Sequence, residues 1–398
     1  MSGFLFCRKS DTLNDTFREL IYMNNFESPH LNQAKQEKQV EVVESRELAF
    51  EKLKRVFTQR LEARFGKEGT DPMSFHNLEH SKVVAEGAEK ILRTIQKIDP
   101  ELVSDEDIEF GYIVGLGHDL VQNADLKEGE MRVRHRGFGE HNKENLKNIG
   151  VSVGNEEASA IEIGKEMEIF QDSEGGVLFP DNEFEKRIFD AVGATYPDAK
   201  FDVKLPEGAL RVEVTHNDTR DDVSLPLEFL KGNKFSQPTL TSESSLVTFA
   251  IAQADLRRIC GATENPEEFQ RQADAEFYEL QSNAIVKEVQ GGIEDISQER
   301  RKEIAETIIN WIKSQVGFTL WQRELFKEAL TNNKIIQKSE KAEEISTALN
   351  ELYRHFDNNI FGVYERYTRV DSKFGAQIQE GVIDDELFKE LLQEIHIL

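Results

Sequence analysis

Cysteine is scarce in this sequence, which has only Cys7 and Cys260 among its 398 residues. Two cysteines cannot build the disulfide framework of a small secreted protein, and such scarcity is typical of a reducing compartment. The chain also lacks a run of about 18 apolar residues, which a membrane-spanning helix requires. Its N-terminal segment has too short an apolar run for a cleaved leader. These absences predict a soluble cytoplasmic protein; a chain exported by a specialised apparatus without a cleaved leader would share them.

Basic residues are few relative to acidic ones. The chain has 49 lysines and arginines against 75 aspartates and glutamates, so its formal net charge is −26. This excess of negative charge repels polyanions and argues against nucleic acid or an anionic membrane as a partner. A small phosphorylated molecule drawn in by a metal ion remains compatible with the charge. The hydrophobic content of 38% is enough for a substantial core.

Helical spacing of apolar residues dominates the chain and predicts a mainly α fold. Residues 1–45 are polar and weakly periodic, and are interpreted as an N-terminal arm. From about Arg46 apolar residues recur at helical spacing, which predicts a helical domain over 46–333. A polar stretch then precedes a C-terminal helical extension over 334–398. We expect this extension to be dispensable for chemistry and available to a protein partner.

Loop-forming residues interrupt the helical pattern between about 171 and 240. Gly, Pro, Asp and Asn accumulate there and mark turns. Within this insertion, FDVKL (201–205) and LRVEV (210–214) alternate apolar and polar residues around PEGA. The alternation predicts a small β-hairpin, which we expect near the mouth of a site.

Several short segments carry side chains suited to metal chemistry. FHNLEH places His76 and His80 four residues apart, on one face of a helix. GHDL places His118 beside Asp119 at the end of another apolar helix, and AQADL places Asp255 where an uncompensated carboxylate is costly to bury. Imidazoles and carboxylates together suit an octahedral divalent ion such as Mn, Mg, Co, Ni or Fe(II). Each segment alone is common background, but their joint occurrence on apolar helices predicts a metal site.

A histidine, then a His-Asp pair, then a distant aspartate, all on helices, resembles the HD superfamily of metal-dependent phosphohydrolases over about residues 46–330. The HNxxH form is similar to that of cyclic-nucleotide phosphodiesterases. The resemblance implies an HD-domain helical bundle and a general acid at His76. It also implies four metal ligands: His80, His118, Asp119 and Asp255.

A closer likeness is to uncharacterised bacterial HD proteins. They have segments like NEEASA (155–160), AxGATYPD (191–198) and SLVTFAIAQADL (245–256), and a later Trp and Gln like Trp311 and Gln315. One departure concerns the number of metal ions. Gln122 stands near the place where the phosphodiesterase pattern has another histidine of a two-metal centre. We therefore favour one tightly bound ion, with a second ion bridged by Asp119 as the alternative.

A basic segment, RVRHR (132–136), stands out in so acidic a chain. Arg132, Arg134 and Arg136 alternate along it, so an extended loop would present their guanidinium groups on one side to grip phosphate. The alternative is a solvated loop paired with nearby glutamates. Further candidates for contact with the substrate are Asn77, Gln122, Glu156 and Thr195, although Glu156 would also suit the start of a helix near residue 155.

The predicted function is hydrolysis of a phosphate ester of a nucleotide-like small molecule. A bound metal would lower the pKa of a water molecule and polarise a phosphoryl oxygen, and Asp119 would orient or deprotonate that water. Two alternatives stay open. One is a metal- or nucleotide-binding HD module without hydrolysis, acting through protein interactions, and the other is a di-iron oxygenase of HD fold. Cys260 is expected to be a core thiol.

Overall fold

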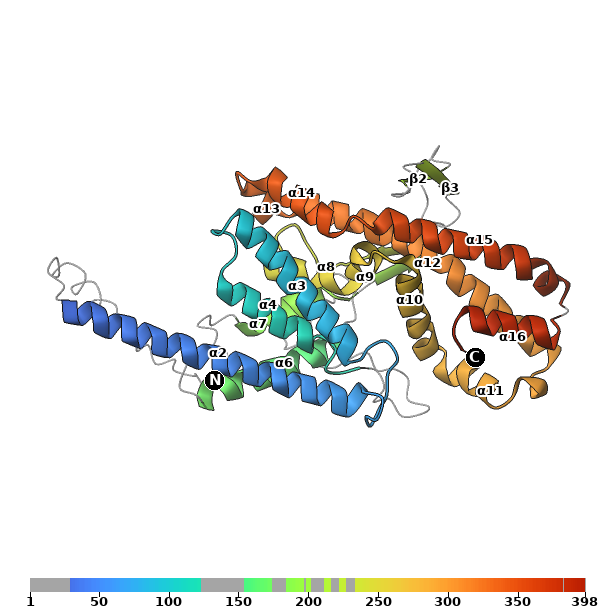
Figure 1. The fold of residues 1–398 in the computed structure, drawn as a ribbon, viewed down its shortest axis with the longest axis horizontal. Coiled ribbons are helices and arrows are strands. Elements are labelled where there is room, and N and C mark those ends of the chain that lie inside the picture. The colour runs from blue at the N-terminus through green and yellow to red at the C-terminus, as the bar shows by residue number, and fades with distance from the viewer. Residues whose placement is uncertain are drawn as a thin grey trace, which may run out of the picture.

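The computed structural model describes residues 29–122, 154–173, 184–196, 198–201, 211–215, 222–226, 233–381 and 383–397. Helices dominate this part of the chain (Figure 1), which confirms the mainly α prediction. Within it, no helix has both the length and the apolar character needed to cross a membrane.

The N-terminal half contains α2 (Pro29–Phe65), α3 (Leu78–Ile98), α4 (Asp105–Gly117), α6 (Gly154–Ser173) and α7 (Phe184–Gly193). The remaining helices are α8 (Leu246–Leu256), α9 (Arg258–Ala262), α10 (Pro266–Leu280), α11 (Lys287–Gln290), α12 (Gln298–Asn332), α13 (Lys334–Lys338), α14 (Ala342–Leu352), α15 (Phe356–Glu380) and α16 (Asp385–Glu394). Short π and 3-10 turns, η3 (Ser282–Val286) and η4 (Ile293–Asp295), lie on either side of α11.

Helices α3, α4 and α8 form the centre of the molecule. The α3 stripe that includes Val84 and Ile91 is buried, as its spacing predicts. A glycine of α4 allows α3 to approach closely, because a Cβ atom on Gly115 would lie 3.0 Å from the Cα of Ala85. Helix α8 is apolar on every side and is buried along nearly its whole length. This close packing fixes the helix ends that carry the candidate ligands.

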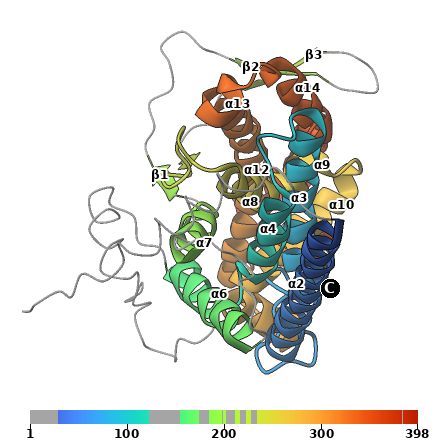
Figure 2. The same cartoon turned by 90° about the vertical axis from the view of Figure 1, so that its left-hand side faces the viewer.

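Helix α2 crosses the predicted boundary between arm and domain. It begins at Pro29, so Arg46 lies inside a continuous helix. Of the apolar residues at helical spacing after Arg46, those from Leu53 to Phe65 are buried in the core, whereas Leu48 is exposed. Helix α6 packs against α2 (Figure 2), where the Arg60 guanidinium donates to both Glu162 and Glu166 at 2.8 Å. The first 28 residues of the predicted arm lie outside the described part of the chain.

Strands form within the predicted insertion, and one of them overlaps a predicted strand. Strand β2 (Arg211–Thr215) pairs antiparallel with β3 (Asp222–Pro226), and β1 (Asp198–Phe201) pairs with β4 (Asn233–Ser236). Strand β2 overlaps the predicted strand 210–214, while most of the other predicted strand, 202–205, lies outside the described residues, so the predicted hairpin stays a prediction. Alternation identifies a strand and its two faces, but it does not choose between two candidate partners. The β2–β3 hairpin lies beside α15 (Figure 1), away from the centre of the bundle.

The C-terminal helices share the hydrophobic core with the predicted domain. One cluster joins residues of α3, α4 and α8 to Ile345 and Ile360. A second cluster joins residues of α10 and α12 to Phe374 and Phe388. The Tyr353 hydroxyl donates to the Gln253 carbonyl at 3.0 Å. A boundary at residues 333/334 thus separates helices that pack on one another, and the extension is not a unit of its own.

A buried ion pair links helix α10 to the C-terminal helix α15. The Arg366 guanidinium donates to both carboxylate oxygens of Asp274, at 2.9 and 2.8 Å. His396 Nδ1 lies 2.9 Å from the same carboxylate. Because a buried carboxylate is costly without such partners, α10 depends on α15 for its position.

Truncation after Asn333 is expected to abolish cooperative folding. It would remove buried side chains from both clusters and leave Asp274 without Arg366, an arrangement that typically costs several kcal/mol. Thermal melting followed by near-UV circular dichroism measures this. Leu280→Ala, at an exposed position of α10, is the control. A truncated chain that melts cooperatively near the full-length temperature would contradict the shared core.

Candidate metal centre

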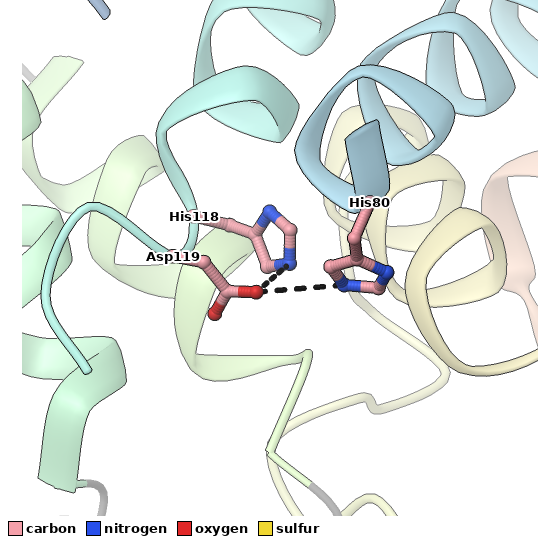
Figure 3. Close-up of side chains that lie close together, drawn as sticks. All are labelled: His80, His118 and Asp119. Carbon is pink, nitrogen blue, oxygen red and sulfur yellow. Dashed lines mark ion pairs between the residues drawn. The ribbon is translucent and has the colours of Figure 1, made fainter. Parts of the chain in front are cut away.

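His80, His118 and Asp119 converge from opposite ends of two successive helices, α3 and α4 (Figure 3). His80 lies in the first turn of α3, while His118 and Asp119 directly follow α4. Asp119 Oδ2 lies 3.0 Å from His118 Nε2 and 3.4 Å from His80 Nε2. These three residues form a group that can hold a metal ion.

Asp255, near the end of α8, adjoins this group. Its Oδ1 lies 3.2 Å from His80 Nε2 and 3.4 Å from His118 Nε2. The structure thus brings together the four side chains that the resemblance implies as ligands, although His80 and Asp255 lie far apart in the sequence.

Asn77 supports the centre from outside it. Its side-chain oxygen caps α3 by accepting from the backbone amides of Glu79 and His80, at 2.9 and 3.3 Å. Its amide nitrogen donates to the carbonyls of Met73 and Ser74. The sequence predicts that Asn77 contacts substrate, but both of its polar groups bond to the backbone at the helix start, so its role is to cap α3. An N-cap of this kind orients the first helical turn, and with it His80.

Hydrogen bonds behind the ligands set which atoms face inward. His118 Nδ1 lies 2.7 Å from the Gly115 carbonyl, which accepts its proton and directs Nε2 toward Asp119. The Gln122 amide donates to Asp119 Oδ1 at 2.5 Å and accepts from Asn155 at 3.3 Å. Gln122 thus orients a carboxylate ligand, which corrects its predicted contact with substrate.

The donor atoms fit a metal ion. Among the described residues, the buried atoms His118 Nε2 and Asp119 Oδ2 have no hydrogen-bond partner, which is costly unless a ligand compensates. An octahedral ion with bonds of about 2.1 Å places neighbouring ligand atoms about 3.0 Å apart. The four measured separations, from 3.0 to 3.4 Å, agree with such a shell.

The charges of the centre also favour a cation. Burial opposes the charged form of each group, yet His118 holds the pKa of Asp119 and of Asp255 below the ordinary range. The same carboxylates hold the pKa of His118 well above its ordinary value, against the effect of burial. Without a metal ion, protons therefore compensate the buried carboxylates, and a divalent ion would displace them.

A cavity of about 470 Å³ opens beside the centre. Glu156 and Thr195, both predicted to contact substrate, lie in its wall. Glu156 is 8% exposed, and burial raises its pKa to about 7, with a contribution from Asp119. The Thr195 hydroxyl donates to the Val192 carbonyl at 2.7 Å, so its oxygen can only accept a bond from a ligand. The geometry places both side chains where a molecule in the cavity would meet them.

His76 also lies in the cavity wall and is held by a residue that sequence reasoning missed. Its Nδ1 lies 2.6 Å from Glu279 Oε1, while the backbone amides of Phe75 and His76 donate to Glu279 Oε2 at 2.9 and 3.1 Å. Burial lowers the pKa of His76, but the hydrogen bond to Glu279 and the surrounding carboxylates outweigh it and raise the pKa to about 9. Nothing in the spacing of Glu279 on α10 indicates this role.

Two other predictions concern arginines and cysteine. Arg132, Arg134 and Arg136 lie outside the described residues. Cys260 is buried, and burial raises the pKa of its thiol, in agreement with a core residue.

Comparison with protein-family models, with curated proteins and with solved structures finds no match to this chain.

Asp119→Ala is expected to remove bound divalent metal while preserving the helical fold. The substitution deletes the carboxylate whose Oδ2 lies close to both histidines. Elemental analysis after loading with Mn²⁺ measures the metal content, and the Mn²⁺-dependent rise in melting temperature gives a second readout. Asp295→Ala, at an exposed position of η4, is the matched control. Stoichiometric metal in Asp119→Ala would refute the assignment.

Proposed function

We propose that this protein is a divalent-metal-dependent hydrolase of phosphate esters, of the HD-superfamily type, that acts on a nucleotide-like small molecule. The observation that carries the proposal is the placement of His76, held by Glu279, in the same cavity wall as His80 and Asp119. A metal ion can activate water and a phosphoryl oxygen, and a histidine can donate a proton to the leaving group, so together they suit hydrolysis of a phosphate ester.

The metal end of the cavity would activate the attacking side of the reaction. A divalent ion held by His80, His118, Asp119 and Asp255 would supply Lewis acidity toward a phosphoryl oxygen and a water. Asp119, fixed through Gln122, holds its carboxylate toward this end. Glu156 is a second carboxyl group in the wall, and with a pKa of about 7 it can accept or return a proton near neutral pH.

His76 would act on the leaving group. The bond from Nδ1 to Glu279 leaves Nε2 as the ring nitrogen that can pass a proton to a molecule in the cavity. A pKa of about 9 means that the ring carries this proton at neutral pH. A cation in the centre would lower that pKa and a bound phosphate would raise it again, so substrate binding prepares His76 to donate.

The remainder of the cavity supports a nucleotide-sized substrate. Its volume of about 470 Å³ falls within the usual range of about 300–1,000 Å³ for small-molecule sites. Ile259, Phe269, Trp311 and Phe318 line it with apolar and aromatic surface, and the Gln315 amide adds a hydrogen-bonding group. Flat aromatic bases stack on such surfaces.

The experiment is elemental analysis of the purified protein, followed by a screen of aryl phosphates and of cyclic and linear nucleotides with several divalent metals. Turnover that depends on metal and is lost in Asp119→Ala supports the proposal. Tight nucleotide binding without turnover would favour a binding module instead. Two bound irons with a visible absorption band would favour an oxygenase.

His76→Ala is expected to slow hydrolysis of esters with a poor alkoxide leaving group by about 10²–10⁴, the usual range for general acid catalysis. A nitrophenyl ester should lose much less, because nitrophenolate departs without protonation. The measurement is the ratio of the two rates in variant and parent at saturating metal.

Glu279→Gln tests the same pair from its other side. We expect a loss in the same direction, because glutamine has one acceptor oxygen in place of two and carries no charge. It can accept either from the His76 ring or from the two backbone amides, and it does not raise the pKa of His76 as the carboxylate does. Equal losses on both esters would assign the pair to substrate positioning. Loss of metal from His76→Ala would make His76 a ligand instead of a proton donor.

A further inference from the structure

One wall of the cavity carries a carboxylate that the chemistry above does not use. Glu276 lies on α10 with Phe269 and Ala273, at positions that share one helical face, and all three line the cavity. Trp311, Gln315 and Phe318 line it from α12 with the same helical spacing. Lys313 and Ser314 also line it from α12, so Glu276 belongs to a wall that is mainly apolar and aromatic, with a few polar groups.

Glu276 and Glu279 differ in their partners although one helical turn separates them. Glu279 interacts with the His76 ring and accepts from two backbone amides. Within the described part of the chain, no residue donates a hydrogen bond to Glu276. Burial raises the pKa of its carboxyl to about 7, with contributions from Glu279 and Asp255. Glu276 is half-buried and lines the cavity, so its carboxylate oxygens are available to N–H groups of a bound ligand.

The position of Glu276 indicates which part of a substrate it would meet. Glu276 lies one helical turn before Glu279, the residue that holds His76. The charge of His76 lowers the pKa of Glu276 and so partly offsets the effect of burial. A substrate whose ester oxygen faces His76 would therefore extend its leaving group along α10, toward Glu276 and the aromatic side chains of α12. A phosphate group would avoid Glu276 because both are anionic.

We propose, on the basis of the hydrolase function above, that Glu276 selects a base with two adjacent N–H donors, which is the hydrogen-bonding edge of guanine. The two carboxylate oxygens accept from N1–H and from the 2-amino group, as a carboxylate does from the two parallel N–H groups of arginine. Adenine and cytosine present one amino group beside a ring nitrogen that accepts, and uracil presents one N–H between two carbonyls. In each of those bases, at least one lone pair would face the carboxylate. Trp311 and Phe318 supply surfaces for stacking on the ring.

The test measures binding of guanosine, inosine and adenosine by calorimetry to the metal-loaded full chain. These nucleosides carry no phosphate ester, so turnover does not interfere. Inosine lacks only the 2-amino group of guanosine. We expect wild-type protein to bind guanosine about 10- to 100-fold more tightly than inosine or adenosine, the range for one good bidentate contact.

Glu276→Gln and Glu276→Leu should both bind guanosine and inosine with nearly equal affinity. The glutamine variant keeps the shape of the side chain, so it reports on the carboxylate even if the leucine variant fails to fold. Glu306→Gln, at an exposed position of α12, is the matched control and should keep the guanosine preference. Equal affinities in the wild type, a preference that survives in Glu276→Gln, or no binding of any nucleoside would each overturn the proposal.

The outcome separates this inference from the proposed hydrolase function. A guanosine preference that depends on Glu276, in a protein that hydrolyses no ester, would retain the base site and refute hydrolysis. Turnover of aryl phosphates without a guanosine preference would retain hydrolysis and refute the role of Glu276.

Discussion

The structure depends on one electrostatic constraint: two carboxylates, Asp119 and Asp255, lie almost without solvent contact against His80 and His118. Buried carboxylates are stable only when positive charge or hydrogen-bond donors compensate them. Three interactions keep the charged side chains in the positions where they compensate one another. They are the helix cap at Asn77, the bond from His118 to the Gly115 carbonyl and the bond from Gln122 to Asp119. The centre is therefore supported by residues that do not belong to it.

Much of this centre can be predicted from the sequence, because ionisable residues on apolar helices are costly and thus informative. That reasoning points to His118, Asp119, Asp255 and the pair His76 and His80, and the family resemblance then implies His80 as the ligand. The mainly helical fold follows from the spacing of apolar residues. The side chains of Asn77 and Gln122 have tasks that differ from the predicted ones, since sequence order does not tell whether an amide beside a ligand faces the cavity or the backbone. Glu279 and Glu276 escape prediction, because the sequence is rich in glutamate and only tertiary packing places these two in the cavity wall.

Errors in the organisation of the chain have a similar origin. A polar stretch at 332–340 suggests a boundary, but polarity describes exposure of the connection and says nothing of where the following helices pack. Alternation identifies strand β2, whereas its partner β3 depends on the closure of a loop that the pattern does not encode. Local signals predict elements well, while the contacts between elements require the three-dimensional structure.

The distance along the chain between His80 and Asp255 has a consequence for folding. A contact that closes so long a loop forms only after α3, α4 and α8 have assembled, since the entropy of closure must be offset by contacts already made. A metal ion would therefore bind at this centre late in folding, after the chain has completed its tertiary packing. Metal uptake during refolding would then report assembly of the bundle and would lag behind the appearance of helix.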